Sequence, residues 1–159
     1  MVQHYDPHHF DSRNSLGYLL KTTHAMMHDC GERIFANSDI SFVQWIALLK
    51  INEGTALTAS DLCREMRHDN GALTRLLDQL ESLGYVVRQR SQQDRRVVDL
   101  QITESGRAKL KELTPQIINN LNAALEPFTA EEFAELIRLL LKLKTRLHEY
   151  NIEQTSQPT

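Results

Sequence analysis

The 159-residue sequence lacks the features that mark several protein classes. Its two cysteines, Cys30 and Cys63, lie far apart and form no CxxC pair, which argues against a disulfide framework and against a cysteine zinc site. No apolar run approaches the roughly 18 residues that span a bilayer. The first residues are rich in His and Asp, whereas a signal peptide is basic and then apolar. We therefore expect a cytoplasmic protein without a membrane partner.

Catalytic signatures are also missing. The chain has no HExxH, no GxSxG, no P-loop glycine run and no GxGxxG, and its acids are scattered over helix faces. We expect neither enzymatic activity nor a cofactor. An apolar content of 41% is enough for a real core, and the length fits a single domain over residues 1–159.

The charge balance restricts the kind of nucleic-acid binding that is possible. A formal charge of -3 argues against a nonspecific polybasic binder, because that mode needs clustered cations. Positive charge is nevertheless local: residues 88–96 contain four arginines and one acid, whereas acids gather in residues 126–135. Such segregation fits a site-specific binder.

Periodic apolar residues and capping signals predict the helices of the first half. Leucines and other apolar residues at three- and four-residue spacing predict a long helix from Ser15 that ends before Asn37. A capping box, S-x-x-Q, opens a second helix at Ser41, and Thr58 with an aspartate three positions on caps a third. Residues 67–70 form a turn between the third helix and the next.

A fourth helix and a hairpin follow. The helix runs from Asn70 to Leu83, with Asp69 as N-cap and Gly84 as the left-handed residue that ends it. Two Val- and Ile-rich segments, residues 85–90 and 97–102, then predict an antiparallel hairpin with a long polar tip. Alternation along its second strand places three side chains in the core: Val98, Leu100 and Ile102.

Two more helices complete the chain. One runs over residues 103–125 and contains Pro115, which removes a backbone donor. The other begins at Thr129 and reaches about Tyr150, and we expect residues 152–159 to fray. Its consecutive leucines 139–141 present apolar surface in more directions than one core contact needs.

Packing against a second copy of the chain is the simplest way to bury the additional apolar surface of the last helix. A two-fold dimer would present two recognition helices about 34–36 Å apart, which matches successive major grooves of DNA. The alternative is a monomer whose terminal helices wrap the central module. We thus predict a mainly α fold with a small β-hairpin wing: a winged helix-turn-helix over residues 38–102, with long dimerisation helices over residues 12–36 and 103–150.

Two segments carry a family resemblance. The runs LTRLLDQLESLGYV and DRRVVDLQITESG, in this order and spacing, resemble the MarR family of multiple-antibiotic-resistance regulators. More loosely, the resemblance extends from LGYLL near the N-terminus through the last helix. It implies a winged-helix homodimer that binds double-stranded DNA, usually represses nearby promoters and responds to a small molecule, metal or oxidant.

The resemblance makes the fourth helix the recognition helix. Asparagine can form two hydrogen bonds to the edge of adenine, and arginine can form two to the edge of guanine. The asparagine and arginine near the start of this helix therefore suit base recognition. Family members often have a larger or hydroxylated residue where this sequence has Gly71 and Ala72. Asn70 and Gly71 can also be read simply as turn residues. The candidate major-groove residues are Asn70, Gly71, Ala72, Thr74 and Arg75.

The family's D-x-R element falls on the predicted wing, at Asp94 and Arg96 with Arg95 between them. Asp94 would hold an arginine, and Arg95 or Arg96 would enter the minor groove, where a narrow A/T tract attracts cations. We expect Arg88 and Arg90 to touch phosphates or to brace the wing.

The family's ligand pockets lie between the dimerising helices and the DNA-binding lobe. The candidate lining residues are His24, Met27, His28, Trp45 and Ile46. Each of them is also explained simply as a core residue or as part of a helix surface. In the peroxide-sensing branch the reactive cysteine stands where this sequence has Gly17, which argues against that mechanism.

Two alternative functions stay open. His24 and His28 are an i, i+4 pair, which leaves a metal-responsive regulator possible, but without a third ligand at a defined spacing we predict no metal site. The winged helix could also serve as a protein-interaction module that does not bind DNA specifically.

Overall fold

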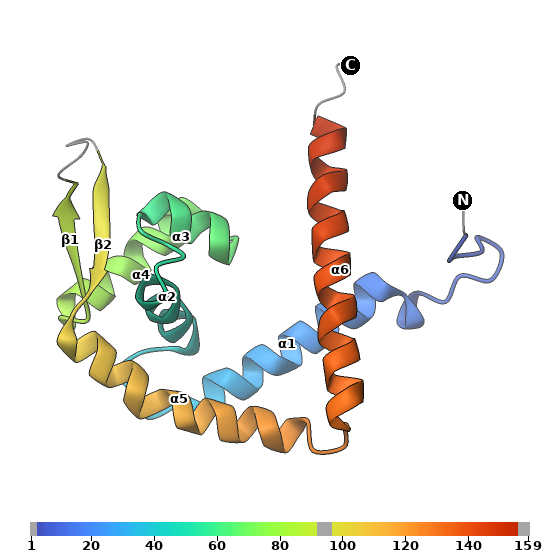
Figure 1. The fold of residues 1–159 in the computed structure, drawn as a ribbon, viewed down its shortest axis with the longest axis horizontal. Helices are drawn as coiled ribbons and strands as arrows, with labels where there is room; N and C mark the ends of the chain where they lie inside the picture. Colours follow the sequence, from blue (N-terminus) through green and yellow to red (C-terminus); the bar gives the residue numbers. More distant parts are fainter. Residues whose placement is uncertain (1–2, 92–96, 156–159) are drawn as a thin grey trace. The chain divides into compact units, whose positions relative to one another are not determined.

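The computed structural model describes residues 3–91 and 97–155 of the chain (Figure 1). Contacts divide the chain into two compact units, one ending at Ile117 and the other beginning at Ile118. None of the described helices combines the length and the apolar character needed to cross a bilayer. In chain order the elements are a 3-10 turn η1 (Ser12–Asn14), α1 (Leu16–Ile34), α2 (Phe42–Asn52), α3 (Ala59–Met66), α4 (Asn70–Ser82), β1 (Val86–Arg90), β2 (Val98–Ile102), α5 (Glu104–Ala124) and α6 (Ala130–Thr155).

The helix starts that the capping signals predict are confirmed. At α2 the Ser41 hydroxyl accepts from the Gln44 amide, and the Gln44 side chain accepts from the Ser41 amide at 2.8 Å. Thr58 and Asp61 form the same reciprocal pair at the start of α3. These bonds satisfy amides that have no partner within the helix.

The core of the first unit lies between α2, α3, α4 and the hairpin (Figure 1). β1 and β2 pair antiparallel, with Val86 opposite Ile102 and Arg90 opposite Val98. The segment before α3 pairs briefly with β2 on its other side. There the Leu100 amide donates a hydrogen bond to the Leu57 carbonyl at 2.7 Å. The largest fully buried side chains of this core are Ile40, Leu48, Leu62, Leu73, Leu77, Leu80 and Val86.

Two details of the sequence prediction are wrong. Val98 does not face the core: it is 43% exposed, whereas Leu100 is 3% exposed. Alternation fixes only the side of a strand, and Val98 pairs with Arg90 at the end of the hairpin away from the packed helices. The last helix also continues through residues 152–155 instead of fraying there. An ion pair of Arg146 with Glu153, at 3.0 Å, supports these final turns.

A polar tie joins three segments of the first unit. Asp39, in the connection between α1 and α2, accepts a hydrogen bond from the Tyr85 hydroxyl at the root of β1. The Lys109 ammonium of α5 lies 3.2 Å from the other Asp39 oxygen and 2.9 Å from Glu112. The Tyr85 hydrogen bond, and then Lys109, lower the pKa of Asp39.

This tie predicts a pH-dependent contribution to stability. Because the pKa of Asp39 is lower in the folded state, its contribution is present above the unfolded value of about 3.9 and is lost as the pH falls through the folded value. We expect Asp39→Asn to reduce the free energy of unfolding at pH 7 and to have a smaller effect near pH 3, below the unfolded value. Urea unfolding at several pH values measures this, with the exposed Asp29→Asn as control. An equal loss at both pH values would contradict the role of the charge.

Candidate nucleic-acid interface

The helix predicted to read bases, α4, has one buried and one exposed face. Leu73, Leu76, Leu77 and Leu80 are buried in the core. The Asp69 side chain caps the helix by accepting from the Ala72 amide at 2.8 Å, which also lowers the pKa of Asp69. Of the predicted major-groove residues, all but the half-buried Ala72 are exposed: Asn70, Gly71, Thr74 and Arg75.

The turn before α4 shapes its first residues. Arg67 ends α3 in the left-handed region with φ of 52°, which reverses the chain between the two helices. Asn70 is the first residue of α4 and Asp69 is its N-cap, as the sequence predicts. Its side-chain oxygen accepts from the Cys63 thiol at 2.9 Å, and its backbone carbonyl accepts from the Thr74 hydroxyl at 2.8 Å. The sequence alone indicates no role for Cys63.

Arg88 joins the hairpin to α4. Its guanidinium lies 2.6 Å from an Asp78 oxygen and 3.2 Å from a Glu81 oxygen, and its side chain is only 28% exposed. A weaker bond reaches the Thr74 carbonyl at 3.5 Å. This geometry favours bracing over phosphate contact. The i, i+3 spacing of Asp78 and Glu81 indicates a shared helix face but not the strand residue that meets it, so the sequence alone does not predict their contact with Arg88.

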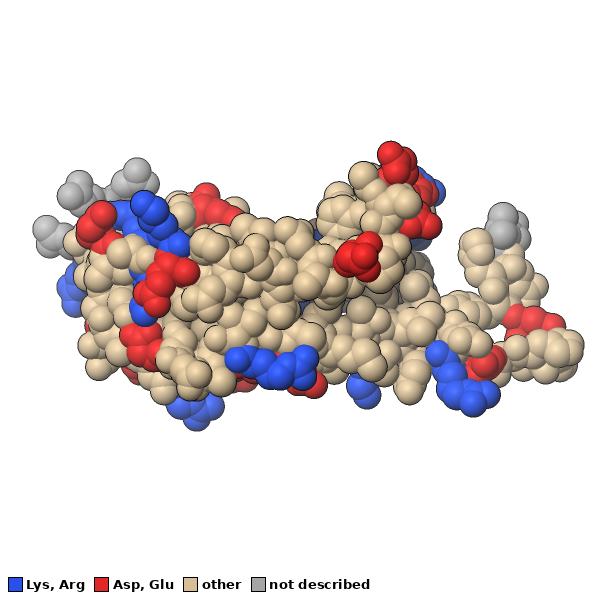
Figure 2. Space-filling model, turned by 90° about the horizontal axis from the view of Figure 1, so that it is seen from below, with Lys and Arg blue, Asp and Glu red and all other residues tan. Residues whose placement is uncertain are grey.

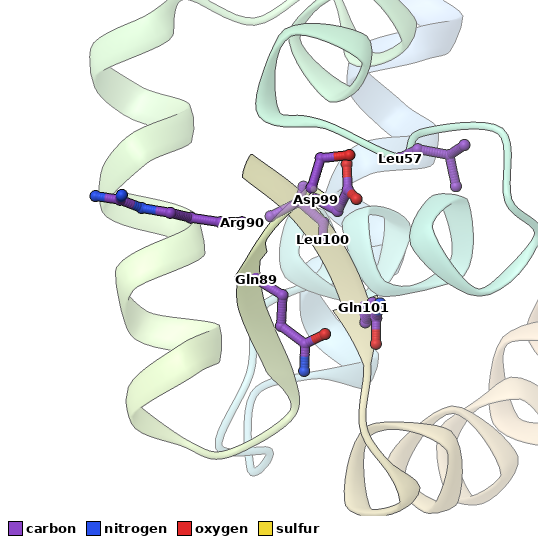
Figure 3. Close-up of a pocket in the computed structure, with 7 residues that line it drawn as sticks. Leu57, Gln89, Arg90, Asp99, Leu100 and Gln101 are labelled. Carbon is purple, nitrogen blue, oxygen red and sulfur yellow. The ribbon is translucent and has the colours of Figure 1, made fainter. Parts of the chain in front are cut away.

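A groove lies along the hairpin between the segment before α3 and the two strands (Figure 3). The Arg90 side chain extends away from the other labelled residues, so its charge is available outside the groove (Figure 3). Asp94, Arg95 and Arg96 of the predicted wing tip lie outside the described residues. The groove is lined by Leu57, Gln89, Arg90, Ser91, Asp99, Leu100 and Gln101.

Charged residues on the face drawn in Figure 2 form small separate groups of both signs between uncharged residues. This distribution agrees with the net charge of -3. This face therefore offers no uniformly basic surface to the phosphates of DNA.

The candidate effector residues are only partly brought together. His28 makes an edge contact with Phe42 at 6.0 Å between ring centroids, and Phe42 stacks on Trp45 at 5.9 Å. Trp45 is 8% exposed, and its indole N–H has no hydrogen-bond partner among the described residues. Ile46 packs on the same core, whereas His24 and Met27 are exposed.

The histidine pair on α1 has contacts of its own. The His24 and His28 rings are 6.5 Å apart, and His28 Nε2 lies 3.7 Å from a Glu32 oxygen. Within residues 3–91 and 97–155, no three His, Cys, Asp or Glu side chains group closely enough to hold a metal ion.

A helix-turn-helix with an exposed second helix, followed by a two-stranded hairpin, defines a winged-helix DNA-binding protein. The MarR family profile matches residues 38–97, which cover α2 through the hairpin tip. The organic hydroperoxide resistance transcriptional regulator of Bacillus subtilis is 30% identical over 143 residues, or 90% of this chain and 96% of that protein. The chain belongs to the MarR family of transcriptional regulators.

Solved structures agree in fold. A mutant of MarR from E. coli complexed with operator DNA has a TM-score of 0.73 and 29% identity, covering 84% of this chain and 99% of that one. BpsR of Bordetella bronchiseptica has a TM-score of 0.75 at 18% identity, covering 85% of this chain and 96% of that one. The latter supports the fold alone.

Proposed function

We propose that the protein is a ligand-responsive repressor that binds an inverted-repeat operator as a homodimer. The observation that carries the proposal is the exposed N-terminal part of α4, held by Asp69 and the preceding turn in a helix-turn-helix. The similar E. coli protein has been crystallised with operator DNA.

Helix α4 and the wing would contact DNA in different grooves. Asn70, Thr74 and Arg75 would meet base edges in the major groove, while Gly71 and Ala72 would let the backbone approach closely. An arginine of the wing tip, Arg95 or Arg96 steadied by Asp94, would enter the minor groove. Arg90 would contact a phosphate, and Arg88 would keep the wing at a fixed angle to α4.

The dimer proposal rests on apolar side chains that the described structure leaves exposed. Within α6 the leucines 139, 140 and 141 are 47%, 38% and 57% exposed. On α1, Leu16, Leu19 and Leu20 are likewise exposed. Burying such surfaces against a second copy would remove them from water, at about 25 cal/mol for each Å².

The dimer proposal predicts that a charge on α6 separates the protomers. We expect Leu140→Glu to convert the protein to a monomer at micromolar concentration, because the charge would have to be buried in the interface. Sedimentation velocity measures this, and Lys142→Glu, also on the exposed α6, is the control. A wild-type protein that sediments as a monomer would refute the dimer.

For the effector we propose a small aromatic or anionic compound near His28 and Trp45. The indole N–H of the buried Trp45 has no hydrogen-bond partner in the described parts of the chain, which supports a ligand with an acceptor group. The similar B. subtilis protein is named for organic hydroperoxide resistance. Gly17 in place of the reactive cysteine of that branch speaks against the same chemistry here.

The decisive test is binding to the DNA upstream of the protein's own coding region. Purified protein is titrated at several salt concentrations with nonspecific competitor present. Tight, competitor-resistant binding that weakens steeply with salt is expected, because phosphate contacts release counterions. Binding to a protein partner instead, without preference for any duplex, would favour the interaction-module alternative.

A further inference from the structure

Cys63 and Asn70 form a contact that spans the turn of the helix-turn-helix. Cys63 is half-buried on α3 and Asn70 is exposed at the start of α4. The sulfur lies 2.9 Å from the Asn70 side-chain oxygen. Since that oxygen can only accept, the thiol donates.

The rest of Asn70 is already fixed by α4. Asp69 caps the helix, and the Asn70 carbonyl accepts from the Thr74 hydroxyl. The backbone therefore leaves the two side-chain torsions of Asn70 undetermined, and these torsions set the orientation of its amide. Among the described residues, the Cys63 thiol on the neighbouring helix is the group that donates a hydrogen bond to this amide.

The restrained amide keeps the groups that base readout needs. A carbonyl oxygen has two lone pairs, of which the thiol occupies one. One lone pair and two N–H groups remain, and a bidentate pair with adenine uses one acceptor and one donor. An amide held in one orientation loses less freedom on binding than one that rotates.

We propose that Cys63 is a positioning residue for base recognition. It touches no DNA, but it orients the Asn70 amide and thereby sets the strength of the base preference at one position of each half-site. This inference rests on the proposed function, because it requires α4 to lie in the major groove.

The experiment selects binding sites from a pool of duplexes with a randomised central segment, followed by affinity measurements on single-position variants. Wild type is compared with the single variants Cys63→Ala, Cys63→Ser and Asn70→Ala, and with the double variant that combines Cys63→Ala and Asn70→Ala. Cys30→Ala is the matched control, because it removes the chain's other thiol, which lies on α1 beside Arg33. Thermal unfolding of each variant checks its fold.

We expect Cys63→Ala to reduce discrimination at one symmetric pair of positions by roughly two- to tenfold, the cost of ordering one side chain. Discrimination elsewhere in the site stays unchanged. Cys63→Ser retains the preference, since a hydroxyl also donates. Asn70→Ala reduces discrimination at this pair of positions more strongly, and adding Cys63→Ala to Asn70→Ala causes no further reduction.

The outcomes separate this inference from the proposed function. If wild type enriches no sequence, specific DNA binding itself fails. If wild type enriches a sequence and Cys63→Ala selects the same one with equal discrimination, the function stands and the positioning role is overturned. An equal loss from Cys63→Ala in the Asn70→Ala background would also overturn it, because the thiol would then act through helix packing.

Discussion

Gly106→Ala is expected to lower the free energy of unfolding by about 1–3 kcal/mol or more, as overpacking of a filled core does. Gly106 is buried near the start of α5. A Cβ there would overlap the Tyr85 carbonyl oxygen and would lie 2.8 Å from Ile102 Cγ1. The first obstacle is backbone, so α5 would have to move away from the hairpin root.

The control for this prediction is the same substitution in open space. Gly17 lies in α1, and a Cβ there meets no atom within 4 Å. Gly17→Ala should be neutral or stabilising by up to about 1 kcal/mol, because alanine favours helix. Chemical denaturation measures both variants. If the two changed stability alike, close packing at Gly106 would not be the cause.

Arg75→Ala is expected to weaken binding to the selected operator by roughly 5- to 150-fold, the range for one lost bidentate base contact of about 1–3 kcal/mol. Arg75 is exposed one turn inside α4, beside the buried Leu76 and Leu77 that fix the helix in the core. Its removal should leave the unfolding free energy nearly unchanged, since it fills no part of that core.

Arg138→Ala provides the matched control, because it removes one cation from α6, where Arg138 pairs with Glu135 at 2.7 Å. Fluorescence anisotropy with labelled duplexes, at fixed salt, compares the two variants. Equal losses for both would mean that net charge, rather than a contact by α4, governs affinity.

The ion pairs of Arg88 link the two parts of the proposed interface. Asp78 and Glu81 lie on α4, and Arg88 lies on β1, so these ion pairs connect α4 to the hairpin. A side chain that is 28% exposed is partly shielded from solvent, which strengthens such pairs relative to fully exposed ones. The wing arginines would then approach DNA at an angle fixed by α4.

The sequence by itself determined the order of the elements, the starts of α2, α3 and α4, and the turn at Gly84. Capping boxes at Ser41 and Thr58, the cap at Asp69 and the left-handed Gly84 each involve residues within a few positions of one another. Such signals act locally, and the structure contains them where the pattern predicts. The winged-helix class followed from their order, and the family motifs agree with it.

Only the tertiary structure decided which side chains meet. Cys63 with Asn70 and Arg88 with Asp78 pair across a turn or between a helix and a strand. Periodicity gives the face of an element but not the residue opposite. It predicted a buried Val98, whereas the core does not extend to that end of β2 and Val98 is exposed. Contacts between separate elements depend on how helices and strands pack, and this is the physical reason the readout geometry could not be derived from spacing alone.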